Sequence, residues 1–442
     1  LAARVLWPDQ RATPLLAAAL VAFNPQFLFT CGLVSNDPLL AALGAALLWR
    51  CLRLARAAEA APLPRLIGCG LLFGLALLTK QSALLFGPLL LWAGWRAVRG
   101  SWCHFLAATL TWGLAALLVA GWWYLRNLKH YGDLFGIELF SAEFAGAPFA
   151  WSDPAAWLGG LTQLVESFWA RFGWMSLFSP AWMLWPYWAL IAIALFGWAR
   201  AERKLPHGLW LGPLMMLVMA LAWLLSFVAA AGLVAWQGRM LFPAIAAIGI
   251  FLALGVQKVK CDLLPFTFCF LPLVLSSLMP FLVIAPAYTW VALPEAQARA
   301  ELGTPIEVRF AQRWERGVVL AGWRLDQPAS TGTDLALTLT WQSLELIPKN
   351  WVVFAHLLDA DDQIIAETNS APCGATLPFP RWTPGDWVRD PHRMALPSSL
   401  PPGRYRLVVG LYLPESGDRM PVWAEDGSQI GDLIRLGEVV LN

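Results

Sequence analysis

Residues 209–233 read LWLGPLMMLVMALAWLLSFVAAAGL, without a single charged side chain. A helix of roughly 20 apolar residues is long enough to cross the hydrocarbon core of a bilayer. The whole chain of 442 residues shares this character, because 58% of it is hydrophobic and only 14% is charged. Soluble domains carry about 25% charged residues, and the mean hydropathy here is +0.58. We therefore expect an integral membrane protein.

Working outward from this run, the sequence contains nine apolar segments that we predict as membrane helices. They are Leu15 to Leu33, Pro38 to Leu54, Leu66 to Leu78, Ser82 to Val98, Phe105 to Leu125, Pro180 to Trp198, Leu209 to Leu233, Leu241 to Val256, and Leu263 to Ala285. The third is short, so it is also a candidate for one half of a broken or re-entrant pair with the fourth, pivoting at Lys80-Gln81.

The absence of charge runs and heptads argues against disorder, coiled coil and nucleic-acid binding.

The charged residues predict an orientation. If the nine segments alternate, most basic residues between them fall on one side, namely Arg4, Arg11, Arg50, Arg53, Arg56, Arg65, Arg96, Arg99, Arg200, Arg203, Lys204, Lys258 and Lys260. The acids on that side are Asp9, Glu59, Glu202 and Asp262. By the positive-inside rule this side is cytoplasmic. We expect a multi-pass membrane protein with a large outer loop over residues 126–179.

From about Tyr288 the apolar runs shorten and alternate with polar residues between Pro, Gly and Asp turns, which is typical of β structure. The predicted strands are Ile306 to Arg309, Val318 to Leu325, Leu335 to Gln342, Trp351 to Asp359, Ile364 to Thr368, Arg404 to Leu413 and Leu433 to Leu441. This pattern predicts an all-β antiparallel sandwich. We expect three parts: a polytopic α-helical membrane domain (1–287), a linker (288–304) and an exported sandwich (305–442).

The cysteine and histidine residues give no metal signature. Of seven cysteines only Cys373 lies in the predicted sandwich, none has CxxC spacing, and the histidines form no HxxxH pair. A disulfide or a structural zinc site in the sandwich is therefore not expected. The chain begins at Leu1 and enters an apolar segment almost at once, so we expect a fragment that lacks an N-terminal region.

Four polar clusters fall at the predicted outer ends of the helices: Ser35-Asn36-Asp37, Thr79-Lys80-Gln81-Ser82, Arg126-Asn127 with His130 to Asp133, and Gln237-Gly238-Arg239. Polar groups near membrane depth are costly and are functional candidates. Lys80, Arg126 and Arg239 are the predicted phosphate ligands. Asp37 or Asp133 is the predicted base or the ligand of a divalent cation, and the supporting residues are Asn36, Gln81, Asn127, Tyr131 and Gln237.

Ordinary structural roles for the same residues stay open. Lys80 and Arg126 fit snorkelling to lipid headgroups, and Asn36-Asp37-Pro38 fits a helix start. The aromatic clusters Trp122 to Tyr124, Phe168-Trp169, Phe172 to Trp174 and Trp182 to Trp188 fit an interfacial belt. The stretch Trp157 to Leu177 reads as an amphipathic helix lying on the outer leaflet.

Several runs together resemble a known family. They are FNPQFLFTCGLVSNDPLLAALGAALLW (23–49), GLLFGLALLTKQSALLFGPLLL (70–91), GWWYLRNLKHYGDLFG (121–136), SFWARFGWMS (167–176) and QGRMLFPAIAAIGIFLALG (237–255). In this order they resemble bacterial GT-C superfamily glycosyltransferases, in particular proteins similar to glycosyltransferase family 39. The tail segments 341–367 and 381–414 are similar to the β domain that often follows such membrane regions.

The resemblance implies transfer of a sugar from a polyprenyl-phosphate donor to a lipid, glycan or protein acceptor at the outer membrane face. Lys80 and Arg239 match basic positions expected near the lipid phosphate, Asp37 an acidic position in the second outer loop, and Arg126-Asn127 the start of the large outer loop. The family's carboxylate in the first outer loop has no counterpart in this chain. Asp37 or Asp133 is its local substitute, and the fragment itself is expected to be inactive although its parent is not.

Two other functions remain as alternatives. A lipid-linked glycan transporter or flippase would show inverted repeats and charges at the bilayer midplane. A non-catalytic anchor would only display the β domain. For that domain we expect glycan recognition or positioning through rings such as Trp341, Trp351, Trp382 and Trp387, with core packing as the competing role of part of them.

Overall fold

The computed structural model describes residues 1–57, 63–99, 101–135, 149–173, 175–200, 208–259, 261, 263–289, 292–312, 315–327, 334–397, 400–424 and 426–441. Two compact units follow one another in the chain, Leu1–Val283 and Ile284–Asn442. Of the residues used to predict the orientation, Glu59, Glu202, Arg203, Lys204, Lys260 and Asp262 lie outside the described residues, as does Trp174 of the aromatic clusters.

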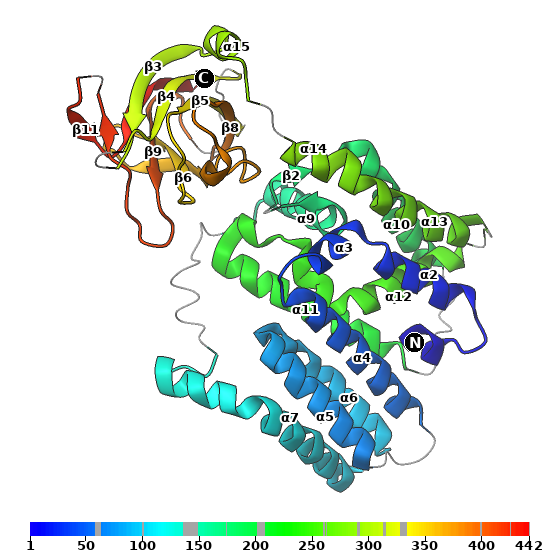
Figure 1. Ribbon diagram of the computed structural model, residues 1–442. Coiled ribbons are helices and arrows are strands. Elements are labelled where there is room, and N and C mark those ends of the chain that lie inside the picture. Colours follow the sequence, from blue (N-terminus) through cyan, green and yellow to red (C-terminus); the bar gives the residue numbers. More distant parts are fainter. Residues whose placement is uncertain are drawn as a thin grey trace. The chain divides into compact units, whose positions relative to one another are not determined.

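The first unit is helical (Figure 1). Its elements are α1 (Ala2–Leu6), α2 (Ala12–Ala22), α3 (Pro25–Cys31), α4 (Asp37–Arg56), α5 (Leu63–Thr79), η1 (Gln81–Phe86), α6 (Gly87–Ala97), α7 (Trp102–Tyr131), α9 (Pro154–Trp169), β1 (Arg171–Phe172), β2 (Leu177–Phe178), α10 (Ala181–Arg200), α11 (Leu211–Ala231), η2 (Gly232–Ala235), η3 (Gly238–Ala244), α12 (Ile245–Lys258) and α13 (Leu263–Met279). The π-helical η4 (Pro280–Ile284) and α14 (Ala285–Tyr288) continue α13. Helix α5 packs against both α4 and α7.

Six of the described helices are long and apolar enough to cross a membrane: α4, α7, α10, α11, η3 with α12, and α13 with η4 and α14. A seventh crossing results if α2 and α3, which are bent by 56° at a short break, form one span. Among the described residues, length and composition therefore support six or seven crossings, where nine were expected. The difference lies in α5, which has only 17 residues, and in the predicted segment Ser82 to Val98, which the structure divides into η1 and the 11-residue α6.

Helix α7 shows the surface that a lipid-facing helix requires. Leu110, Leu114, Leu118 and Leu125 are all exposed, and Leu118 keeps 83% of its surface accessible. A soluble protein rarely exposes such a continuous apolar face. In a bilayer the same face is surrounded by acyl chains at no cost. Together with the spanning helices it indicates a multi-pass membrane protein.

Close helix packing in the unit depends on small residues. A side chain built at Gly197 of α10 would overlap the carbonyl oxygen of Gly255 in α12, and one built at Gly255 would overlap the backbone of Ala194. Membrane helices approach closely where both present small residues, because the contact is made by backbone atoms. The glycines thereby fix the α10–α12 contact.

The predicted amphipathic helix Trp157 to Leu177 is shorter than expected. Helix α9 ends at Trp169, and β1 and β2 then form a two-stranded hairpin that pairs Arg171 with Phe178 and Phe172 with Leu177. Phe168, Trp169 and Phe172 are buried rather than interfacial. Trp169 stacks on Tyr187 of α10 with the ring centroids 4.4 Å apart, so these aromatic residues are core of the helical unit.

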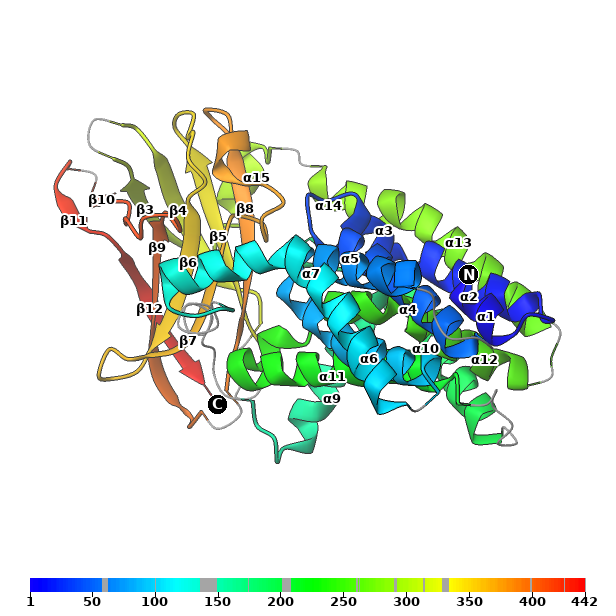
Figure 2. The ribbon, with the colours of Figure 1, turned by 90° about the horizontal axis from the view of Figure 1, so that it is seen from below.

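The second unit contains α15 (Glu295–Ala300), η5 (Phe379–Arg381) and ten strands: β3 (Thr304–Phe310), β4 (Val318–Leu325), β5 (Asp334–Ser343), β6 (Val352–Leu358), β7 (Ile364–Ser370), β8 (Trp387–Ala395), β9 (Gly403–Tyr412), β10 (Val422–Trp423), β11 (Gln429–Gly431) and β12 (Ile434–Leu441). Six strands form one sheet in the order β11-β10-β3-β4-β5-β8, and four form another in the order β12-β9-β6-β7. All of the strand pairs are antiparallel. Figure 2 shows the strands from below.

The two sheets share one hydrophobic core, to which the buried sides of both contribute, for example Phe310, Leu339 and Trp341 from the first and Val353 and Leu407 from the second. Antiparallel sheets packed in this way form a sandwich. The predicted strands all coincide with observed ones within one or two residues. Strands β8, β10 and β11 were not predicted.

Strand β8 escaped prediction because its sequence is polar and contains a proline. Pro391 pairs with Thr338 of β5, and proline is tolerated on an edge strand, where one side forms no ladder. Asp390 and His392 point inward together with apolar neighbours. Asp390 is fully buried and accepts hydrogen bonds from Trp341 Nε1 (3.2 Å) and from the Cys373 backbone N–H (2.6 Å). A satisfied buried carboxylate thus replaces an apolar core residue.

Candidate functional site

Two of the predicted clusters meet at an ion pair. Lys80 Nζ lies 2.6 Å from Asp37 Oδ1. The Asp37 side chain is only 4% exposed and that of Lys80 is 30% exposed. Asp37 begins α4, where a carboxylate is stabilised by the positive end of the helix dipole. The Asn36 side chain donates to the Thr79 carbonyl (3.1 Å), which ties the two clusters together a second time.

The backbone explains why Lys80 can reach Asp37. Helix α5 ends at Thr79, Lys80 is extended with φ −162°, and η1 then begins at Gln81. The predicted pivot at Lys80-Gln81 therefore coincides with the observed break. Breaks of this kind at membrane depth are tolerated where the chain is buried in protein or faces a polar cavity. The extended backbone at this break places the Lys80 side chain beside Asp37.

The third cluster, Gln237-Gly238-Arg239, forms the start of η3. Gln237 Oε1 accepts a hydrogen bond from Arg239 Nε at 2.7 Å. The Gly238 N–H donates to Ser167 Oγ of α9 at 2.8 Å. A side chain at Gly238 would overlap the backbone of Phe168, so only glycine allows this approach. Arg239 is thereby held at the junction of η3 and α9.

Helix α4 connects these clusters. Both η1 and η3 pack against α4, and both pack against α11. Phe86, the last residue of η1, and Pro243 of η3 come together at Gly44 of α4. Lys80 precedes η1 and Arg239 lies in the first turn of η3, so the two cations belong to two segments that pack against the same helices, α4 and α11.

The fourth cluster, at the end of α7, makes local contacts. Arg126 stacks over the Trp123 ring at 5.0 Å, and Asn127 Nδ2 donates to the Leu134 carbonyl at 3.4 Å. Asp133 Oδ1 accepts from the Phe135 N–H at 2.8 Å. Tyr131 is exposed. These contacts stabilise the turn after α7.

Sequence reasoning missed three buried polar residues that hold this region together. Asn24 Nδ2 donates to the Phe168 carbonyl at 3.0 Å, and Asn24 Oδ1 caps α3 by accepting from the Phe27 N–H at 2.8 Å. Gln26 Oε1 accepts from the Arg171 N–H at 2.9 Å. The third is the buried Ser167, whose hydroxyl oxygen accepts from the Gly238 N–H. Asn24-Pro25 has the signature of a helix start. This signature identifies Asn24 as the cap of α3, but it does not reveal the hydrogen bond from Asn24 to the Phe168 carbonyl.

All four tryptophans predicted for glycan recognition are buried in the β unit. Trp341, Trp351 and Trp382 belong to the core of the sandwich, so the expectation that these rings recognise glycans is wrong. Trp387 is also buried, but on the other face of its sheet, where it packs with α15.

Within the described residues, no group of three or more His, Cys, Asp or Glu side chains is placed to hold a metal ion.

Comparisons with known proteins identify no family. Neither a family model nor a curated protein matches the chain. Among solved structures, one match is the Pseudomonas fluorescens alkylpurine DNA glycosylase AlkC bound to DNA containing an abasic site analog, with 12% identity, 95% of this chain and 99% of that chain covered, and a TM-score of 0.15. Because that score is far below the level of a shared fold, the match carries no argument about fold or function.

Proposed function

We propose that this protein is a membrane glycosyltransferase that transfers a sugar from a polyprenyl-phosphate donor to a lipid, glycan or protein acceptor. The observation that carries the proposal is the buried Asp37 carboxylate paired with Lys80 at a helix break, with the η3 segment of Arg239 packed along the same helix. A carboxylate and two cations are the groups that such a transfer requires. The resemblance of the runs around them to GT-C enzymes supports the same reading.

The chemistry assigns a role to each group. The acceptor hydroxyl attacks the anomeric carbon, Asp37 takes up the hydroxyl proton, and the bond to the lipid phosphate breaks. Lys80 and Arg239 stabilise the negative charge on the departing phosphate. In the structure Lys80 neutralises Asp37. A donor phosphate competes for the Lys80 ammonium, and the carboxylate released from this pair is then able to accept the proton.

The test is a transfer assay in proteoliposomes with radiolabelled undecaprenyl-phosphate glucose, using the chain together with any coding sequence upstream of Leu1. Lys80→Ala and Arg239→Ala should each lower turnover at least tenfold, the factor that corresponds to about 1.4 kcal/mol. Lys258→Ala is the matched control, because Lys258 lies at the opposite end of the η3–α12 span from Arg239. Unchanged turnover in Lys80→Ala and Arg239→Ala would remove the proposed phosphate site.

A second candidate, a transporter of lipid-linked glycans, is favoured by the broken helices. The 56° bend between α2 and α3 and the break between α5 and η1 are features that transporters use at their binding sites. The same proteoliposomes separate the two functions. A transporter moves the intact donor across the bilayer without cleaving its phosphate bond, whereas a transferase releases the lipid phosphate.

A further inference from the structure

A row of five residues crosses the six-stranded sheet of the β unit. Trp423 pairs with Arg309, Arg309 with Val319, Val319 with Gln342, and Gln342 with Trp387. The row runs through β10, β3, β4, β5 and β8 in direct register. Because neighbouring strands lie about 4.8 Å apart, its two ends are about 19 Å apart. We call it the cross-strand row.

The cross-strand row faces away from the sandwich core. Its neighbours along the strands, such as Val422, Phe310 and Val388, belong to that core, and side chains alternate between the two faces of a strand. Four of its residues are half-buried, namely Trp423, Arg309, Val319 and Gln342. The row is therefore the surface of the sheet that the sandwich itself does not use.

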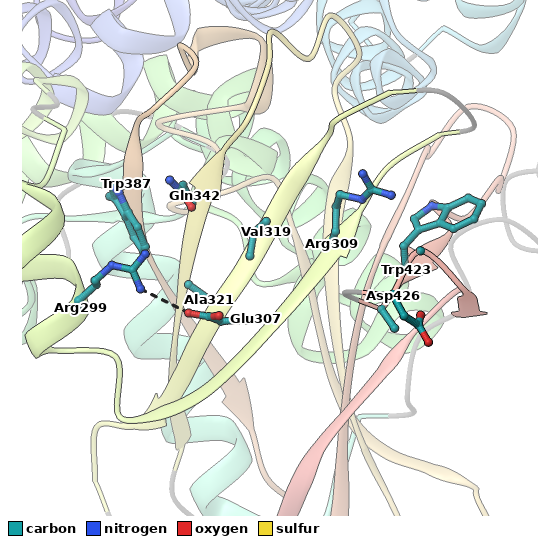
Figure 3. A pocket seen from close by; sticks show the side chains of 11 residues that line it. Arg299, Glu307, Arg309, Val319, Ala321, Gln342, Trp387, Trp423 and Asp426 are labelled. Carbon is teal, nitrogen blue, oxygen red and sulfur yellow. Dashed lines mark hydrogen bonds and ion pairs between the residues drawn. The ribbon is translucent and has the colours of Figure 1, made fainter.

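A cavity of about 440 Å³ lies over this row (Figure 3). Small-molecule sites range over roughly 300–1,000 Å³. Val319 and Ala321 form an apolar floor, while Gln342, Glu307 and Asp426 add polar groups around it. The surface thus combines a flat apolar base with hydrogen-bonding side chains at its rim.

At one end of the row, Trp423 is fixed in place. Its Nε1 donates to the Ala311 carbonyl at 2.9 Å, and the Arg309 guanidinium lies over the ring at 6.0 Å. Within the described part of the chain, Arg309 forms an ion pair with no carboxylate. A held aromatic ring and an available guanidinium are a common pair for binding a ring with hydroxyl groups, through its C–H face and its hydroxyls respectively.

At the other end, Trp387 is buried and supports Arg299, whose guanidinium lies over the ring at 5.0 Å. Arg299 also donates to Glu295 (2.8 Å) and Glu307 (3.4 Å). Glu307 has φ +50° at a bulge in β3, where the register with β4 shifts. Bulges re-aim side chains, and a left-handed conformation at a residue other than glycine is costly. The strand thus bears a strained residue at the cavity.

The charges in the cavity are nearly balanced. Arg299 and Arg309 face Glu307 and Asp426. Hydrogen bonds from Ser428 lower the pKa of Asp426, so this carboxylate is ionised and acts only as an acceptor. The β unit as a whole contains more acidic than basic residues, which disfavours a polyanionic ligand.

We propose that the cross-strand row is a binding site for a neutral, linear glycan lying across the strands. Each strand spacing is close to the length that one sugar unit adds to an extended glycan. Trp423 takes the apolar face of one unit, and Arg309, Gln342 and Asp426 bind hydroxyl groups. The inference rests on the proposed function only in naming this glycan as the acceptor or product of the transferase.

The test is isothermal titration calorimetry of the full chain in detergent micelles. The neutral ligands are cellohexaose, maltohexaose and laminarihexaose, and hexagalacturonate is the acidic comparison. At least one neutral hexasaccharide should bind. Trp423→Ala and Gln342→Ala should each weaken its binding about tenfold, or about 1.4 kcal/mol. Trp423→Phe keeps a ring but removes the indole N–H, so it should retain most of the affinity and show that a lost fold does not explain Trp423→Ala. Arg404→Ala, with a side chain 77% exposed on the other sheet, is the control and should bind as the wild type.

Three results would overturn the proposal: no binding of any of the neutral hexasaccharides, binding of hexagalacturonate alone, or binding that Trp423→Ala and Gln342→Ala leave unchanged. The titration requires no transfer. Loss of the Lys80 phosphate site would therefore leave its outcome unaffected, and failure of the glycan site would leave the transfer assay unaffected.

Discussion

At the scale of single residues, two buried acids lie beside groups that pair with them. Asp37 is almost fully buried, and Lys80 is its ion-pair partner. Asp390 is fully buried and bonded on both oxygens. Burying a charge without a partner is costly, so in both cases the partner is what allows the acid to be there. The two acids differ in their partners. The Lys80 side chain is partly exposed, so it can exchange Asp37 for another anion.

The Asp37–Lys80 pair can be tested by removing first one charge and then both. Lys80→Met leaves a buried carboxylate unpaired and should cost about 1–3 kcal/mol, less than the roughly 3–5 kcal/mol of a fully buried pair because Lys80 is partly exposed. The double variant Lys80→Met with Asp37→Asn removes both charges and should recover most of this stability. Thermal unfolding in detergent measures both. Equal losses in Lys80→Met and in the double variant would contradict this, because the loss would then not come from an unpaired Asp37 carboxylate.

Asp390 should behave as a structural residue of the sandwich. Asp390→Ala leaves the buried donors of Trp341, Cys373 and His392 without an acceptor, and each costs about 1–3 kcal/mol. The unfolding temperature of the β unit should therefore fall steeply. Asp361→Ala, in the exposed turn between β6 and β7, should change stability by less than about 0.5 kcal/mol. Similar stability of the two variants would contradict the buried network.

At the scale of elements, the helical unit is organised by close approaches and by breaks. Glycine and alanine bring α10 and α12 into backbone contact, while α5 stops at Thr79 and η1 begins at Gln81 after the extended Lys80. Neither feature follows from side-chain hydrophobicity alone, because all of these helices are apolar. Packing specificity in membranes comes from shape and polar contacts.

The α10–α12 contact gives a prediction at this scale. Gly197→Val should separate the two helices, since the new side chain meets the Gly255 carbonyl. We expect a loss of about 3 kcal/mol or a failure to purify as a monodisperse species. Gly113→Val, at a position of α7 with open space around it, is the matched control and should be tolerated. Size-exclusion chromatography and thermal unfolding distinguish the outcomes, and equal tolerance of both substitutions would argue against the contact.

Much of this element structure could be predicted from the sequence. The break at Lys80-Gln81 follows from a short apolar run, and seven strands follow from alternation between turns. The membrane crossings were overcounted because apolar composition alone does not distinguish a full span from α5 or α6. Strand β8 was missed because its inward Asp390 and His392 look like surface residues, and only the tertiary structure supplies their partners.

The candidate sites were predictable to different degrees. The association of Asn36-Asp37 with Lys80 followed from the expectation that outer helix ends converge. The cross-strand row was invisible, since Trp423, Arg309 and Gln342 are distant in sequence and only the strand register aligns them. The glycan role assigned to Trp341 and Trp382 failed because alternation along a strand does not reveal which face is the core.

At the scale of the whole molecule, the two units have opposite charge character, basic for the helical part and acidic for the β part. The basic connections predict that the β unit is exported. Trypsin added to intact spheroplasts should therefore digest the β unit, which has exposed arginines such as Arg404 and Arg419, and leave the cytoplasmic connections intact. Protection of the β unit until the membrane is permeabilised would reverse the orientation.

The most direct measurement of the central claim is binding of undecaprenyl phosphate to the chain by native mass spectrometry. We predict a one-to-one complex whose affinity falls about tenfold, or about 1.4 kcal/mol, in Lys80→Ala and in Arg239→Ala and is unchanged in Lys258→Ala. Equal affinity in the wild type and in all three variants would contradict the claim that Lys80 and Arg239 hold a lipid phosphate.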